Sequence, residues 1–219
     1  MISTHGCVQW LVKPIGFQAL IRRCPKCALK RHFFPGGTFR VNAQKKTLDI
    51  WSIYKCEICD YTWNIDIVSR VNISRIDHAL YERFLSNDHE EICRRAFDYN
   101  ALLRTNNVLG PPPDFDVEGD EITTLPGTPQ LEVNIQLQYP IQVRLVTILA
   151  KKLNLSRSRI VTLAAAGVIS GVSGRELNRK ARPVQMIALD VAGVMAARTA
   201  CPLPEPEGDH DVSGPARPC

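Results

Sequence analysis

The sequence predicts an α+β protein built from two ordered modules, and three patterns lead to this prediction. Two Cys-x-x-Cys pairs, with short alternating segments between and after them, indicate a small antiparallel sheet. Apolar residues repeated every three or four positions indicate helices after that sheet and again near residues 145–167. An acidic segment rich in proline and glycine separates these two groups. At 219 residues, the chain is long enough for one ordinary core or two small ones.

These patterns divide the chain into four parts. We expect residues 1–105 to form a sheet with a two-helix cap and residues 106–129 to form an acidic linker. Residues 130–198 are expected to form a small module of two helices and strands, and residues 199–219 a disordered tail. Residues 143–182 contain nine Lys or Arg but one Asp or Glu. Such a block indicates either a polyanion-binding surface or a solvated helical face.

The cysteine pairs are the strongest chemical signal. Two intervening residues allow a turn that directs both thiolates at one ion, and Zn²⁺ prefers four ligands at tetrahedral corners. The chain shows no secretory signal and no apolar run long enough to span a bilayer, so we expect a reducing, cytoplasmic setting rather than disulfides. A redox dithiol is the weaker alternative. The predicted ligands of one structural zinc ion are Cys24, Cys27, Cys56 and Cys59.

Short strands are predicted around these pairs. Residues 39–43 and 61–67 alternate between apolar and polar side chains, and residues 48–55 are rich in β-forming residues. Three short antiparallel strands that carry two cysteine turns make a zinc ribbon. A site closed by four thiolates leaves no position for an activated water, which argues against hydrolysis by the metal.

Two helices are predicted to cap this ribbon. Ser74 and Asp88 each precede a carboxylate by three residues, which is typical of a helix start. Apolar stripes follow each start and are expected to pack on the sheet. The stripes are Ile76, Leu80 and Phe84 in the first helix, and Ile92, Ala96, Tyr99 and Leu103 in the second.

The first hundred residues resemble a known family. The segments that carry the resemblance are Trp10-Leu11-Val12, Leu48-Asp49-Ile50-Trp51, Tyr54-Lys55-Cys56, Thr62-Trp63-Asn64 and Ala96-Phe97-Asp98, together with the first cysteine pair before residues 39–43. They are similar to the bacterial domain of unknown function family numbered 1062, over roughly residues 10–190 of this chain. The resemblance implies a bacterial, cytoplasmic protein and supplies no activity.

A pair of short helices is predicted in the basic block. Leu145, Leu149 and Leu153 form one apolar stripe, a new helix starts at Ser156, and Gly167 is a natural stop. This places Arg157 and Arg159 in the first turn of the second helix, where cations oppose the helix dipole. A phosphate bound at this helix start would explain the placement, since free N–H groups and guanidinium groups bind it together. The alternative is that both side chains extend into water.

Residues 144–169 resemble the small RNA-binding domain of ribosomal small-subunit protein four. The resemblance implies that the helix pair and the following strands present basic residues to structured RNA, such as ribosomal or transfer RNA. By position, the implied contacts are Arg144, Lys151, Lys152, Arg157, Arg159, Arg175, Arg179, Lys180 and Arg182. The sequence departs from that domain at Val172-Ser173-Gly174, which comes about one residue late. A closing strand is expected at residues 184–189.

Other functions remain open from the sequence. The helix pair also suits a helix-turn-helix DNA-binding regulator, although the second helix has few side chains that could read a groove. A third alternative is a zinc-ribbon adaptor that docks a protein partner. Motifs for nucleotide phosphates, dinucleotides, serine hydrolases and zinc proteases are absent. We therefore expect a non-catalytic, zinc-containing protein that binds structured RNA and no membrane.

Overall fold

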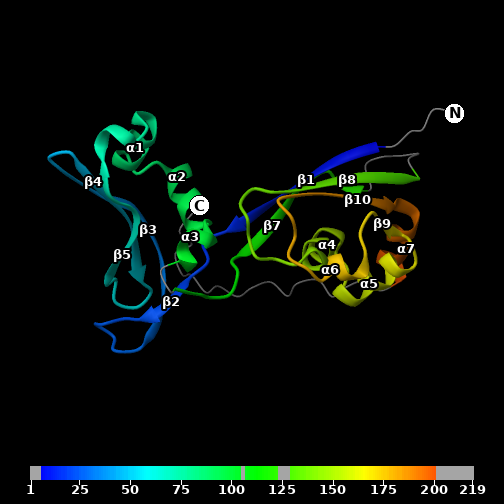
Figure 1. Cartoon of the computed structure of the whole chain (residues 1–219). Helices are drawn as coiled ribbons and strands as arrows, with labels where there is room; N and C mark the ends of the chain where they lie inside the picture. The colour runs from blue at the N-terminus through cyan, green and yellow to red at the C-terminus, as the bar shows by residue number, and fades with distance from the viewer. Residues whose placement is uncertain (1–5, 105–106, 123–128, 201–219) are drawn as a thin grey trace. The chain divides into compact units, whose positions relative to one another are not determined.

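The computed structural model describes residues 6–104, 107–122 and 129–200, and it forms two compact units (Figure 1). The cysteine unit extends from Ile15 to Pro113. The helix-pair unit combines the chain up to Pro14 with the chain from Asp114 onward. Each unit contains a five-stranded sheet and helices, which confirms the predicted α+β class. None of the helices in these described ranges is both long and apolar enough to cross a membrane.

The cysteine unit is built on an antiparallel sheet with the strand order β5-β4-β3-β2-β6. The three strands predicted for the ribbon are confirmed as β3, β4 and β5, and each is longer than predicted. The elements of the unit are β2 (Leu20–Arg23), β3 (Lys30–Gln44), β4 (Thr47–Cys56), β5 (Thr62–Asn72), the 3-10 helix η1 (Ile73–Arg75), α1 (His78–Leu85), α2 (His89–Ala96), α3 (Tyr99–Leu103) and β6 (Val108–Leu109).

One face of this sheet packs against α1 and α2. Leu48 and Ile50 of β4 are fully buried there, because apolar residues alternate with polar ones along the strand. Phe39 of β3 contacts Phe84 of α1 edge to face, with ring centroids 4.9 Å apart. Ile92 of α2 completes the cluster. The predicted packing on the sheet is therefore found for the first stripe and, in the second stripe, for Ile92.

The helix boundaries differ from the prediction in two places. Asp77, not Ser74, caps α1, because its carboxylate accepts a hydrogen bond from the backbone of Leu80. The second predicted helix is two helices: α2 starts at Asp88 as expected, and Asp98 then caps the separate α3. Asp98 lies inside the predicted apolar stripe, and as a helix cap it separates α2 from α3. Leu103, at the end of that stripe, is half exposed.

The helix-pair unit contains a mixed sheet with the order β7-β1-β8-β10-β9. The strand β1 runs parallel to β8, whereas β10 is antiparallel to both of its neighbours. The elements are β1 (Gly6–Ile15), β7 (Asp114–Gly119), β8 (Gln130–Leu137), α4 (Leu145–Leu153), α5 (Arg157–Ala165), β9 (Ile169–Ser170), α6 (Gly174–Leu177), β10 (Val184–Asp190) and α7 (Val191–Ala200).

The core of this unit lies between the sheet and its helices (Figure 1). Along β8, Leu131, Val133 and Ile135 are buried and alternate with polar residues. The predicted helix pair is confirmed as α4 and α5. The chain reverses between them at Asn154, which adopts a left-handed conformation (φ 51°), and Gly167 (φ 76°) follows α5.

The units differ from the predicted division of the chain. Residues 1–105 are predicted to form one part, but within them Gly6 to Val12 of β1 pair with Leu131 to Leu137 of β8 in the helix-pair unit. The predicted linker contains the strands β6 and β7. In β7, Phe115 and Val117 are buried and alternate with acidic residues. Of the predicted tail, Thr199 and Ala200 end α7, and residues 201–219 lie outside the described residues.

Candidate metal centre

The two Cys-x-x-Cys segments form turns with the same backbone. In each turn, the N–H of the first cysteine donates to the carbonyl five residues later: Cys24 to Leu29 at 2.9 Å, and Cys56 to Tyr61 at 3.0 Å. The residue after each second cysteine is left-handed, Ala28 with φ 56° and Asp60 with φ 55°. Both turns therefore hold their two thiols in matching orientations at the ends of strands.

The turns bring the four predicted ligands together. The sulfur atoms of Cys24, Cys27, Cys56 and Cys59 all lie within 4.8 Å of one another. Four ligands at 2.3 Å from a tetrahedral ion would be separated by about 3.8 Å, so the spacing suits one ion. Cys24 Sγ and Cys59 Sγ are 3.5 Å apart, which is far beyond an S–S bond of about 2.05 Å. These four thiols can hold a metal ion.

The strands β3 and β4 position one turn against the other. Phe33 pairs directly with Cys56, and its buried ring meets Trp63 edge to face at 6.2 Å. Next to it, His32 Nδ1 lies 3.0 Å from Glu57 Oε2, and the His32 backbone N–H donates to the same carboxylate. The guanidinium of Arg22 stacks 3.3 Å above Trp63. The second turn is thus fixed by contacts outside the thiols.

The neighbouring groups shift the pKa values of the thiols in different directions, lowering that of Cys24 and raising those of Cys27 and Cys59. Burial opposes ionisation of Cys24, but N–H groups of Cys27 and Lys26 and the neighbouring thiols donate to its sulfur, and the net effect lowers the pKa of Cys24 to about 7. For Cys59, the Tyr61 N–H favours the thiolate, but burial and the other thiols raise the pKa to about 12. A divalent cation among the sulfurs would favour all four thiolates.

The basic residues predicted as RNA contacts fall into two groups. Arg144, Arg157, Arg175 and Arg179 are exposed, and Arg157 lies in the first turn of α5, which Ser156 caps. The structure brings part of this group together, because Arg144 pairs with Lys180 in an isolated antiparallel bridge. Arg159 is half-buried, and its Nε is buried without a hydrogen-bond partner among the described residues. The four exposed guanidinium groups are therefore in contact with solvent, whereas that of Arg159 is partly buried.

Lys151 and Lys152 are used inside the unit. Lys152 Nζ donates to the carbonyl of Gly119 at 2.9 Å and lies 3.1 Å from Glu121, and its side chain is only 7% exposed. It also lies 5.8 Å from the ring of Trp10. Lys151 Nζ donates to the carbonyl of Phe115. Both ammonium groups therefore attach α4 to β7 and the segment that follows it.

Glu176 organises the basic loop after α5. Its carboxylate accepts hydrogen bonds from the backbone and hydroxyl of Ser173, and these bonds, followed by the charges of Arg182 and Arg179, lower the pKa of Glu176. Arg182 forms an ion pair with it at 2.9 Å. Ser173 caps α6, so the segment Val172-Ser173-Gly174, where the sequence departs from the resembled domain, forms a helix start. Before it, the short strand β9 ends next to Gly171 (φ 81°).

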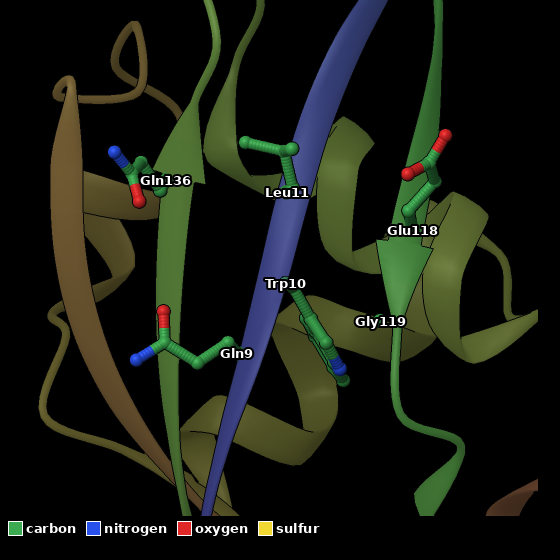
Figure 2. Close-up of a pocket in the computed structure, with 6 residues that line it drawn as sticks. All are labelled: Gln9, Trp10, Leu11, Glu118, Gly119 and Gln136. Atoms are coloured by element: carbon green, nitrogen blue, oxygen red, sulfur yellow. The ribbon is translucent and has the colours of Figure 1, made fainter.

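A pocket of about 330 Å³ on the helix-pair unit was not predicted (Figure 2). It lies where β1, β7 and β8 meet, and its lining comprises Gln9, Trp10, Leu11, Glu118, Gly119 and Gln136. Glu118 forms an ion pair with Lys13 at 2.6 Å, and the indole N–H of Trp10 donates to the carbonyl of Asp120. A Cβ at Gly119 would lie 2.0 Å from the Gln9 carbonyl, so glycine permits this close strand contact. The lining offers hydrogen-bonding amides.

A comparison with known families finds one match. A family model described as "Protein of unknown function (DUF1062)" matches residues 41–175, which is more than half of the chain. This range contains the second cysteine pair and the helix pair, and it begins after the first cysteine pair. No curated protein and no solved structure matches the chain.

Proposed function

We propose that this chain, which belongs to the DUF1062 family, is a non-catalytic zinc protein that binds structured RNA through its helix-pair unit. The observation that supports RNA binding is the group of exposed arginines at α5 and α6. Arg157 and Arg175 have no ion pair or hydrogen bond among the described residues, and Glu176 is the one carboxylate in residues 143–182. Exposed guanidinium groups near helix starts are suited to phosphate.

The metal is proposed to be zinc. Four thiolates form a soft, closed, tetrahedral donor set, which is typical of structural Zn²⁺. All four donors come from strand-bound turns, so the ion would hold the ends of β2 and β4 together. Metal analysis of the purified chain should find about one zinc per chain. Chain without metal, or with iron and its visible absorption, would contradict this part of the proposal.

RNA binding is tested with a labelled RNA hairpin in fluorescence anisotropy. The affinity should fall steeply as salt increases, because each phosphate contact releases counterions. Replacing Arg157 and Arg175 together by alanine should weaken binding and reduce the slope of log affinity against log salt by roughly one per lost contact. The matched control is Lys46→Ala with Arg75→Ala, which removes two exposed cations from the cysteine unit. Absence of hairpin binding at ~50 mM salt would exclude the proposal.

DNA is the alternative ligand for the same arginines. The first turn of α5 exposes Arg157 and Ser158, and Val161 is 40% exposed one turn later. A helix-turn-helix protein would use this face in the major groove. Duplex DNA and hairpin RNA compared at matched salt separate the two ligands, and tighter binding to the duplex would favour a regulator.

A protein-docking role is favoured by a different feature. Ile58 and Leu29 are 63% and 57% exposed at the two cysteine turns. If the chain is an adaptor, Ile58→Ser should abolish partner binding, whereas the paired replacement of Arg157 and Arg175 should leave it unchanged. The reverse pattern would support nucleic-acid binding.

A further inference from the structure

The outer face of the cysteine-unit sheet is a surface that the proposed function does not use. Side chains alternate along β4, so Tyr54 and Cys56 are buried on the inner face while Trp51 and Lys55 point to the outer face. The helices α1 and α2 pack on the inner face. Among the described residues of this unit, no helix covers the outer face (Figure 1).

Cations and aromatic rings alternate across the outer face. Strand register places them side by side, with Phe34 opposite Lys55, Arg40 opposite Trp51, and Arg23 opposite Lys30. Like charges directly opposite each other destabilise a sheet, so the pair Arg23 and Lys30 needs an anion or solvent to offset the repulsion. We define the outer face by its seven basic and aromatic residues, Arg23, Lys30, His32, Phe34, Arg40, Trp51 and Lys55.

The two aromatic side chains are partly accessible, and Trp51 already contacts a cation. Phe34 is 38% exposed, although a phenyl ring has no polar group to gain from water. The ring of His32 lies 6.5 Å from it. The guanidinium of Arg40 lies 5.7 Å from the ring of Trp51. Rings of this kind offer flat surfaces on which a base can stack, and the cations beside them can reach the adjoining phosphates.

The charge of this region suits a polyanion. The first 48 residues contain nine Lys or Arg and no Asp or Glu. Carboxylates also lie near this surface: Glu57 contacts His32, Asp49 accepts a hydrogen bond from the backbone N–H of Arg70 at 2.8 Å, and Asp66 lies directly opposite Trp51. Asp60 is exposed in the second cysteine turn. Arg23 and Lys30, beside the first cysteine turn, form no ion pair among the described residues.

Two further arginines lie on the inner face of the sheet. Arg22 and Arg31 are directly opposite each other and share the face of Phe33 and Cys56, and the guanidinium of Arg22 stacks on Trp63. Arg23, Lys30, Arg40 and Lys55 point to the other face.

We propose that the outer face binds unpaired nucleotides of RNA, with bases stacked on Phe34 and Trp51 and phosphates bound by the neighbouring cations. This proposal rests on the proposed function only in that the ligand is RNA. The residues of the outer face are different ones and lie on the cysteine unit. The two surfaces would contact different parts of one RNA. The helix-pair unit would bind folded segments, and the outer face would bind an adjoining single strand.

The test uses the full chain with zinc and a fluorescein-labelled oligouridine of about 15 nucleotides. Phe34→Ala should weaken binding roughly 5- to 100-fold without changing the salt slope, because stacking releases no counterions. Arg40→Ala with Lys55→Ala should weaken binding and reduce the slope by about 0.7 per lost phosphate contact. Matched controls are Ile58→Ala for an exposed apolar residue and Lys46→Ala with Arg75→Ala for charge. Circular dichroism should show that each variant is folded.

The outcomes separate this proposal from the proposed function. Unchanged oligouridine binding by folded Phe34→Ala, or equal losses in the charge control, would overturn the stacking platform while leaving hairpin binding by Arg157 and Arg175 intact. Loss of hairpin binding with retained, Phe34-dependent oligouridine binding would instead overturn the proposed function alone. Tighter binding of single-stranded DNA than of oligouridine would show that the face does not select RNA.

Discussion

The two units reach a stable fold by different means. In the cysteine unit, the strands that carry the ligands end in turns, and beyond them lie exposed Leu29 and Ile58 rather than core. The helix-pair unit instead buries apolar residues from both sheet and helices, such as Ile135 and Leu149. The metal would therefore stabilise the end of the sheet that carries the cysteine turns, whereas α1 and α2 provide the apolar core on the rest of that sheet. This difference predicts that metal loss and core mutations affect different units.

The largest expected effect is removal of the metal. Structural zinc contributes apparent binding energies of about 10–16 kcal/mol, which exceeds the stability of many small domains. Cys56→Ser, or a strong chelator, should therefore unfold the cysteine turns and the adjoining ends of β3 and β4. Hydrogen exchange followed by mass spectrometry should show faster exchange at residues 30–34 and unchanged protection in β8. Equal loss of protection in both units would show that the metal stabilises the chain as a whole.

A core substitution in the helix-pair unit should lower the stability of that unit without affecting the metal centre. Leu149→Ala removes a fully buried side chain of α4 and should cost about 2–5 kcal/mol, because it leaves a cavity. The zinc content should not change. Denaturant unfolding and metal analysis on the same sample measure the two quantities. Val161→Ala, at a site that is 40% exposed, is the control and should cost less than about 0.5 kcal/mol.

A third prediction separates structural from functional cations in the same helix pair. Lys152→Met keeps most of the side-chain volume but removes the bonds to Gly119 and Glu121, and it should destabilise the unit by about 1–3 kcal/mol. The salt slope for hairpin RNA should stay the same. Arg157→Ala should instead reduce the salt slope for hairpin RNA and leave the free energy of unfolding almost unchanged. A reduced salt slope in Lys152→Met would mean that this ammonium group contacts the RNA.

The smallest predicted effect tests the helix starts. Asp77→Ala removes the cap of α1 and should cost roughly 1 kcal/mol, because the Leu80 N–H loses its acceptor. Ser74→Ala should cost less, since its hydroxyl donates only to the exposed Asn72. Urea unfolding of the two variants gives the comparison. Equal costs would show that Ser74 contributes to the cap from outside the helix.

Local patterns carried much of the prediction. The four cysteines, the three ribbon strands and the helix pair depend on spacing, alternation and caps within short segments, and the structure contains all of them. The misplaced start of α1 has a local cause as well. Ser74 and Asp77 both satisfy a cap pattern, and the stripe of Ile76, Leu80 and Phe84 fits either start.

The sequence by itself determined the ligand set, because two Cys-x-x-Cys turns can be recognised from the spacing of their own residues. Only the tertiary structure decided that β1 joins β8, since a strand signal says nothing about a partner more than 120 residues away. It also decided which cations remain free. Lys152 and Arg157 cannot be told apart by charge in the sequence. Their positions on their helices direct Lys152 toward Gly119 and Arg157 toward solvent. The same alternation of side chains along β4 placed Trp51 and Lys55 together on the face opposite to Tyr54 and Cys56.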